Sequence, residues 1–204
     1  MIPAMNMEAQ HRKKDPVRLH RQLLESAAMI AGRDGIAALS LNAVAREAGV
    51  SKGGLLHHFP NKQALIFALF ARLLAIMEKA ISELMAADNI AYGRFTRAYL
   101  RYLSNPELTD THESRQLMVL SLAMPDEPVL SLAMPDEPVL RKCWRDWMLD
   151  HLAQGDALDN GPTGTLVRYA ADGIWLSELT EGRTMSSEHR QSLVNDLTKM
   201  TLPA

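Results

Sequence analysis

The sequence predicts an all-α protein, and three observations lead to that fold class. Apolar residues recur at three- and four-residue spacing along most of the chain, which is the period of an amphipathic helix. No segment shows the strict alternation of apolar and polar residues that a half-buried strand has. Residues that favour helix ends, mainly Ser, Asn, Gly and Pro, separate the periodic segments. With 204 residues, 47% of them hydrophobic, the chain can bury a sizeable core in one or two domains.

The N-terminal part of the chain is predicted to hold a polar arm followed by a long helix. Residues 1–15 are polar and contain a His-Arg-Lys-Lys run, so we expect a flexible basic arm there. A helix is predicted over residues 16–34, with Gly35 at its end. The apolar stripe of this helix is formed by Leu19, Leu23, Ala27, Ile30 and Ala31.

Two short helices joined at a glycine are predicted next, over residues 41–48 and 52–59. Ser40 and Ser51 each stand directly before one of them, where a hydroxyl accepts a hydrogen bond from the free amides of the first turn. Gly49 stands where the first helix must end in a left-handed turn, which glycine adopts without steric cost. Paired short helices of this kind deliver side chains into the major groove of DNA.

The second short helix has an inward and an outward side. Leu55 and Phe59 are four residues apart and are expected to face the core, and Pro60 ends the helix. Lys62 lies in the first turn of a third helix, which Asn61 caps. A positive side chain there interacts unfavourably with the positive end of the helix dipole, and a contact with a DNA phosphate would explain its presence. The candidate DNA-binding residues are therefore Ser40, Ser51, Lys52, Gly53, Gly54, Leu56, His57, His58 and Lys62.

Four of these candidates, and the basic arm, have a second interpretation. Ser40 and Ser51 either bond phosphates or act only as caps. The adjacent His57 and His58 point about 100° apart on a helix and have no nearby Cys or His partner, so no metal is expected. The basic arm either enters a minor groove or is simply disordered.

The order of these residues resembles the TetR family of transcriptional regulators. The matching residues are Gly35, Leu41, Val44, Ala45, the run from Ala48 to Gly53, His58-Phe59 and Asn61-Lys62. The resemblance extends from about Arg21 to Phe70. Many members carry a tyrosine at the positions of Leu56 or His57; here the His57 imidazole could bond a phosphate instead, and Leu56 could touch a thymine methyl.

The charge of the chain is divided between its two parts. Residues 1–62 hold nine Lys and Arg against five Asp and Glu, a net charge of +4, whereas residues 63–204 hold 13 against 19, a net charge of −6. We call residues 16–62 the head and residues 63–204 the body. A basic head on an acidic body places the attraction for phosphate at one end of the molecule.

The body is predicted to contain six helices. They span residues 62–86, 92–103, 112–124, 139–154, 162–181 and 188–200. The first starts at the head and is the mechanical link between the two parts. The resemblance implies that residues 162–181 and 188–200 pair with their symmetry mates in a homodimer, although they could also pack within a monomer.

The resemblance also implies a pocket in the body for a small apolar or cationic effector. Asp172 and Glu178, on an otherwise apolar helix, could face a cationic ligand or a partner subunit. The pocket candidates, for each of which plain core packing is the favoured alternative, are Phe95, Tyr99, Tyr102, Met118, Trp144, Trp147, Met148 and Trp175.

A ten-residue sequence occurs twice in the body. Residues 121–130 and 131–140 are identical, and Val119-Leu120 matches Val129-Leu130 upstream. Two copies are too few and too short for a solenoid, so the repeat indicates a recent tandem duplication in the gene or an artefact. Each copy carries Pro-Asp-Glu-Pro, which breaks helices. We expect DNA binding to survive this insertion and the ligand response or stability to change.

The remaining features narrow the function. The single Cys143 cannot form an internal disulfide, and no signal peptide or apolar membrane span is present, which suits a cytoplasmic, nucleoid-associated protein. No nucleophile motif, phosphate loop or metal cluster supports an enzyme, and no cofactor is expected. The sequence predicts a homodimeric repressor released from a near-palindromic operator by a small molecule. The alternative is an architectural or protein-recruiting DNA-binding factor without an inducer.

Overall fold

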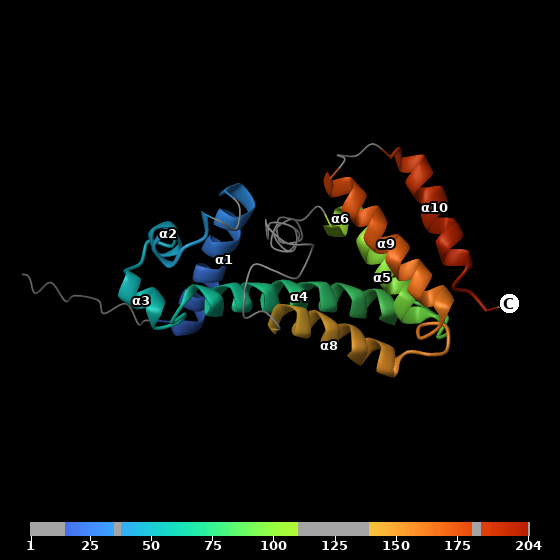
Figure 1. Ribbon diagram of the computed structural model, residues 1–204, viewed down its shortest axis with the longest axis horizontal. Helices are drawn as coiled ribbons and strands as arrows, with labels where there is room; N and C mark the ends of the chain where they lie inside the picture. The colour runs from blue at the N-terminus through green and yellow to red at the C-terminus, as the bar shows by residue number, and fades with distance from the viewer. Residues whose placement is uncertain (1–14, 35–37, 110–138, 181–184, 204) are drawn as a thin grey trace, which may run out of the picture.

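The computed structural model describes residues 15–34, 38–109, 139–180 and 185–203, and the regular structure in these ranges is entirely helical. The molecule is elongated, with the head at one end, the body at the other and one long helix running between them (Figure 1). The helices are α1 (Pro16–Asp34), α2 (Leu41–Glu47), α3 (Lys52–Leu56), α4 (Lys62–Ala86), α5 (Arg94–Ser104), α6 (Pro106–Thr109), α8 (Val139–Gln154), α9 (Pro162–Thr180) and α10 (Ser187–Lys199).

Helix α1 begins at Pro16, as predicted, but Asp15, the last residue of the expected arm, belongs to the start of the helix. Asp15 lies at its start, where its carboxylate Oδ1 accepts hydrogen bonds from the amides of Val17 and Arg18, each at 3.1 Å. Asp15 therefore caps α1 rather than belonging to the arm, because a carboxylate satisfies the free amides at a positive helix end. Residues 1–14 lie outside the described part of the chain.

The core of the head is built on the predicted apolar stripes. Leu23, Ala27, Ile30 and Ala31 of α1 are buried, as the 3.6-residue period predicted. The same cluster takes in the first turns of α4, through Leu65, Ile66, Leu69, Phe70 and Leu73. A division of the chain at Lys62 therefore runs through a shared core, and α4 is as much a part of the head as it is of the body.

Helix α3 is shorter than predicted. It ends at Leu56 instead of continuing to Phe59, and a turn covers His57 and His58. Pro60 disfavours the helical conformation of the residue before it, which moves the end of the helix back. Phe59 is nonetheless 2% exposed and packs in the core, so its inward direction was predicted correctly.

The body packs around α5. Helix α5 lies between α4 and α9 and also contacts α10, whereas α8 packs against α4 (Figure 1). The predicted helices at 62–86 and 139–154 are confirmed, and α9 and α10 agree within one residue. Buried side chains of α4, α5, α9 and α10 form one apolar cluster, which Trp144, Trp147 and Met148 of α8 cover. The predicted helix at 112–124 and almost all of the duplicated segment lie outside the described residues.

Helix α5 begins at Arg94, two residues later than predicted, because Gly93 precedes it in a left-handed conformation (φ +68°). A Cβ at this position would lie 2.8 Å from the Leu158 side chain and 2.9 Å from the Thr201 carbonyl oxygen. Only glycine fits this approach of three segments.

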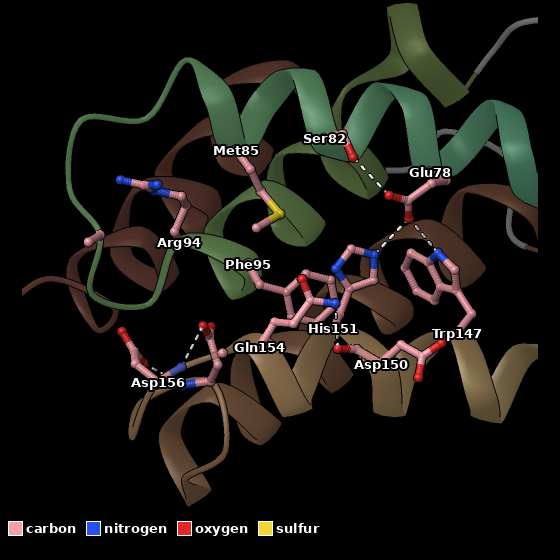
Figure 2. A pocket seen from close by; sticks show the side chains of 13 residues that line it. Glu78, Ser82, Met85, Arg94, Phe95, Trp147, Asp150, His151, Gln154 and Asp156 are labelled. Carbon is pink, nitrogen blue, oxygen red and sulfur yellow. Dashed lines mark hydrogen bonds and ion pairs between the residues drawn. The ribbon is translucent and has the colours of Figure 1, made fainter.

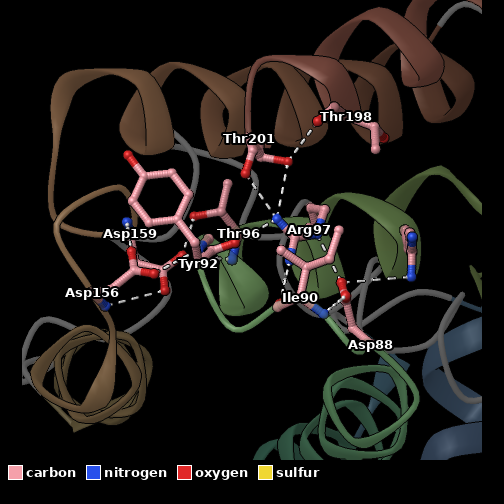
Figure 3. Close-up of polar contacts among 11 residues, drawn as sticks. Asp88, Ile90, Tyr92, Thr96, Arg97, Asp156, Asp159, Thr198 and Thr201 are labelled. Carbon is pink, nitrogen blue, oxygen red and sulfur yellow. Dashed lines mark hydrogen bonds and ion pairs between the residues drawn. The ribbon is translucent and has the colours of Figure 1, made fainter. Parts of the chain in front are cut away.

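One buried arginine ties α5 to the α4–α5 loop and to the segment after α10 (Figure 3). Arg97 of α5 is 1% exposed, and its Nε donates to Asp88 Oδ2 at 2.7 Å. Its two terminal nitrogens donate to the carbonyl oxygens of Ile90 at 2.6 Å, Tyr92 at 2.6 Å and Thr201 at 2.8 Å. The α4–α5 loop, α5 and the segment after α10 thus share one charge-assisted network.

A second network joins α5 to the loop between α8 and α9. Asp159 Oδ1 accepts hydrogen bonds from the Thr96 amide at 2.9 Å and the Thr96 hydroxyl at 2.7 Å. Arg168 of α9 donates to the Thr96 hydroxyl at 3.0 Å and to the Asp159 carbonyl at 2.7 Å. The start of α5 is therefore joined to α9 and to the loop before it by buried polar groups, which specify how the helices dock.

Candidate nucleic-acid interface and body pocket

Helix α3 presents an open face at the end of the head. Leu55 is fully buried and anchors the helix, whereas Lys52, Gly53, Leu56 and His57 are exposed. Leu56 leaves 37% of its surface in solvent although it is apolar. This division agrees with the predicted inward and outward sides, and it leaves an apolar side chain, an imidazole and an ammonium group free on a short helix.

Two positions of the head are occupied by glycine for different physical reasons. Gly49, in the turn between α2 and α3, adopts φ +66°, which L-residues rarely do. Gly53 has an ordinary helical conformation, and a Cβ there would meet nothing within 4 Å. Packing inside the protein therefore does not require a glycine at position 53. Its bare backbone is useful only if something outside the protein approaches it closely.

Ser40 and Ser51 both act as helix caps. Ser40 Oγ accepts a hydrogen bond from the Ala43 amide and Ser51 Oγ from the Gly54 amide, each at 3.1 Å. Asn61 does the same for α4, at 2.7 Å from the Ala64 amide. Capping uses the oxygen as an acceptor, so the exposed hydroxyl of each serine keeps its own proton to donate.

His58 departs from the predicted outward direction. It is half-buried in the turn after α3, with its ring 5.9 Å from that of His20 on α1 and 6.0 Å from that of His57. Burial, followed by the charges of His20 and His57, lowers the pKa of His58. The neutral ring is therefore favoured, and His58 packs α3 against α1 rather than standing free with His57.

The cations of this face have no acidic partner within the described residues. Lys52 is exposed and Lys62 half-buried, and neither forms an ion pair there; nor does the exposed Arg46 of α2. Sequence reasoning missed Gln22, whose Nε2 donates to the Ala48 carbonyl at 2.9 Å and so holds the α2–α3 turn to α1. The available signal was a polar residue three positions after Leu19 and next to the buried Leu23, although Gln22 itself is exposed.

The body contains a cavity of about 680 Å³ between α4, α5 and α8. Its lining includes only two of the predicted pocket residues, Phe95 and Trp147. Tyr99 and Tyr102 are buried in the core behind it, and Trp144, Met148 and Trp175 pack against that core. Met118 lies outside the described residues. The remaining lining residues are Glu78, Ser82, Met85, Ala91, Arg94, Asp150, His151, Gln154, Gly155, Asp156 and Asp159.

Glu78 of α4 is the polar centre of one end of this cavity (Figure 2). Its Oε2 accepts from Trp147 Nε1 at 2.6 Å and lies 2.7 Å from His151 Nε2, and its Oε1 accepts from the Ser82 hydroxyl at 2.8 Å. Burial raises the pKa of Glu78, but the bonds from His151, Ser82 and Trp147 outweigh it and leave the pKa below its ordinary value. Glu78 is therefore held as a carboxylate.

Asp172 does not face this cavity. Its Oδ1 accepts a hydrogen bond from the Tyr99 hydroxyl at 2.6 Å, between α9 and α5. Burial is the main cause that raises the pKa of Asp172, against the hydrogen bond from Tyr99 and the charge of Arg168. The expectation of a ligand or partner contact at Asp172 is thus replaced by an internal bond, and the side chain of Glu178 lies outside the described part of the structure.

Helix α9 keeps an apolar face in solvent. Val167, Ala171 and Ile174 are buried against the body, whereas Leu166 is 54% exposed and Tyr169 is 71% exposed. A Cβ at Gly173, one turn after Tyr169, would meet nothing within 4 Å. Exposed apolar residues beside a residue without a side chain allow another helix to approach closely.

Two further features are absent from the described residues. No group of three His, Cys, Asp or Glu side chains there is arranged to hold a metal ion. None of the described helices has the length and apolar character that crossing a bilayer requires.

Comparisons with known proteins place both parts of the chain. Residues 23–69 match a family model described as bacterial regulatory proteins, tetR family, and residues 93–202 match one described as tetracyclin repressor-like, C-terminal domain. An HTH-type transcriptional regulator BetI from Pseudomonas paraeruginosa is 32% identical over 108 residues, which are 53% of this chain and 53% of that protein. The chain thus spans about half the length of the curated relatives it matches.

Solved structures share the fold. A transcriptional regulator from Rhodococcus sp. Rha1 superposes with a TM-score of 0.66 at 19% identity, over 90% of this chain and 95% of that one. The multidrug binding protein EbrR complexed with ethidium superposes with a TM-score of 0.60 at 22% identity, over 88% and 97%. At such identities the likeness shows the common architecture alone.

Proposed function

Because the chain belongs to the TetR family, whose members are DNA-binding transcriptional regulators rather than enzymes, we propose that it is a homodimeric repressor that a small molecule releases from a near-palindromic operator. The observation that carries this proposal is the shared helix α4. Its first turns lie in the core of the head, whereas Glu78, Ser82 and Met85 of the same helix line the body cavity. A ligand that favours another position of α4 would therefore move the head.

The proposed DNA contact is the exposed face of α3 with the caps on either side of it. Leu56 would reach a base edge, and Lys52, His57 and Lys62 would contact phosphates. Ser40 and Ser51 would donate their free hydroxyl protons to phosphates while capping their helices. Gly53 would let the backbone approach the groove, while His58 supports the face from behind by packing on α1.

The proposed dimer is formed by residues 162–181 and 188–200. Leu166 and Tyr169 provide an apolar surface on α9 that the body leaves in solvent. A two-fold arrangement places the same surface of a second copy against it, so that the apolar patch of each copy is buried by the other. The dimer presents two heads, which doubles the DNA surface that the small α3 alone can contact.

The proposed effector is a small apolar or cationic molecule in the body cavity. Four carboxylates line the cavity, those of Glu78, Asp150, Asp156 and Asp159, against the single guanidinium of Arg94. A cation is attracted to such a lining and an anion is repelled. The multidrug binding protein EbrR, which shares this fold, has been complexed with ethidium, and this supports a ligand-receiving role for the chain.

The test begins with an unbiased selection of DNA. The full-length protein is used to select sequences from randomised duplexes, and the winners are measured by fluorescence anisotropy. We expect an enriched, near-palindromic site bound by a dimer, and a loss of affinity when an effector is added. An asymmetric site bound by a monomer would contradict the dimer. Operator affinity that no cavity ligand changes would favour the architectural or protein-recruiting factor.

A further inference from the structure

The end of the cavity that contains Glu78 is built like a receptor for a flat cation, and a side chain of the protein already occupies it. The ring of His151 lies parallel to that of Phe95, with a centroid distance of 4.5 Å and an interplanar angle of 2°. The Trp147 ring meets it at 4.7 Å and 67°. His151 Nε2 lies 2.7 Å from Glu78 Oε2 (Figure 2).

These partners are those that a planar organic cation requires. A positive charge over or beside an aromatic ring is attracted by the ring quadrupole, and the attraction grows when water is excluded. A carboxylate supplies the counter-charge. Glu78 is oriented for this role by Trp147 Nε1 and the Ser82 hydroxyl, which hold its two oxygens at 2.6 and 2.8 Å.

We propose that this cage of Phe95, Trp147 and Glu78 is the binding site for a planar aromatic cation, and that the His151 ring fills it when no ligand is bound. The imidazole of His151 is itself a small planar ring with a nitrogen 2.7 Å from the carboxylate, so the free protein satisfies the cage with its own side chain. The ligand binds by displacing that ring and taking its place between Phe95 and Glu78. This inference deepens the proposed effector role of the cavity and rests on it.

The rest of the cavity agrees with a cationic ligand larger than imidazole. The volume of about 680 Å³ exceeds the space of one ring, and Asp150 also belongs to the lining. The Asp150 side chain is exposed and has no hydrogen-bond or ion-pair partner in the described residues. Arg94, the only guanidinium of the lining, lies at the opposite end from Glu78 in Figure 2. The charge that a ligand meets next to the cage is therefore negative.

The test uses a matched pair of probes without DNA, because flat cations also intercalate into duplexes. The permanently charged 10-methylacridinium and neutral acridine have the same ring system, and both are titrated at pH 8 by calorimetry. We expect the cation to bind at least tenfold more tightly than acridine. Glu78→Gln, which keeps the shape of the side chain, should weaken the cation about tenfold and leave acridine unchanged. His151→Ala should bind the cation several-fold more tightly, because the competing ring is gone.

Two controls keep the result specific. Glu83→Gln removes an exposed carboxylate from the same helix, 68% accessible and ion-paired with Lys79, and should change neither affinity. The His151 ring signal in the wild-type protein, assigned by its absence in His151→Gln, should move when the cation is added, because the ring leaves the shielding face of Phe95. This measurement does not depend on whether His151→Ala folds.

Three results would overturn the inference: equal binding of both probes by the wild-type protein, an unchanged cation preference in Glu78→Gln, or a His151 signal that stays in place at saturation. Operator release is scored separately. If the cation binds the cage but the operator is retained, the repressor mechanism fails and the site stands. If another ligand releases the operator from Glu78→Gln as well as from the wild type, the mechanism stands and the site fails.

Discussion

Replacement of Arg97 by methionine should lower the free energy of unfolding by about 3–5 kcal/mol, which is the usual cost of breaking a buried ion pair from one side. Methionine retains most of the apolar stem, so the loss is that of the guanidinium. Asp88, whose side chain is 6% exposed, then keeps only the Ile90 amide at 2.9 Å and Arg101 at 3.9 Å. The carbonyls of Ile90, Tyr92 and Thr201 also lose their donor.

The matched control is Arg101→Met. Arg101 stands four residues later on α5 and reaches the same carboxylate, but it is 43% exposed. A solvent-screened contact of this kind contributes at most about 1 kcal/mol. Urea unfolding followed by circular dichroism at pH 7 measures both variants at one protein concentration, because association affects apparent stability. A loss below 1 kcal/mol in Arg97→Met, or equal losses in the two variants, would refute the reasoning.

The pH dependence provides a second check on the same pair. Burial raises the pKa of Asp88, but the bonds from Arg97 and the Ile90 amide outweigh it and hold the pKa below its ordinary value. A carboxylate whose pKa is lower in the folded state stabilises the fold above its unfolded pKa of about 3.9. This stabilisation is lost as the pH falls through the folded pKa. The difference between wild type and Arg97→Met should therefore shrink below about pH 4.

Three further predictions concern the proposed DNA contact, the dimer and a buried acid. Lys62→Ala should weaken binding to all DNA sequences and make the slope of log affinity against log salt shallower by about 0.9 per head, or about 1.8 for the proposed dimer. Lys79→Ala, which removes a 79% exposed lysine of the same helix, should leave the slope unchanged. An equal slope in both variants would remove Lys62 from the phosphate contacts. Leu166→Glu should convert the dimer to a monomer in light scattering, while Leu149→Glu, at an α8 position that is also 54% exposed, should not; dimers in both would exclude the α9 face as the interface. Asp172→Asn should raise the free energy of unfolding at pH 7. Burial raises the pKa of Asp172 in the folded state, so above the unfolded pKa of about 3.9 the native state binds more protons than the unfolded chain and loses stability as the pH rises through the folded pKa. A variant that is less stable than the wild type at pH 7 would contradict this sign.

Local chemistry explains which parts of the fold could be predicted from the sequence. Caps and apolar stripes depend on residues within one or two turns, so Ser40, Ser51 and Asn61 marked three helix starts correctly. The bounds of α4 followed from the same signals. The end of α3 and the start of α5 were misplaced, because a proline acts on the residue before it and Gly93 is fixed by contacts with Leu158 and Thr201 far along the chain.

The cavity was located in the right part of the body but with mostly different residues. Aromatic and methionine residues were the available signal, and most of them pack in the core, where large apolar side chains are most stable. Glu78 and His151 are 73 positions apart and meet only after α8 docks on α4. A carboxylate on a helix is usually a solvated surface residue, so no local pattern marks Glu78 as part of a site.

The separation of contacts along the chain also sets an order of events during synthesis. The hydrogen bond between Gln22 and Ala48 in the head joins residues only 26 positions apart, and the buried core of the head ends at Leu73. Arg97 obtains its last acceptor from Thr201, 104 positions later. At about 5–20 residues per second, roughly 130 further residues take on the order of 6 to 26 seconds to emerge. During that interval the nascent chain carries a head whose core residues are all present and a body that is still incomplete. The Arg97 guanidinium lacks its Thr201 acceptor until the end of synthesis, so this is the period in which we expect a chaperone to bind the body.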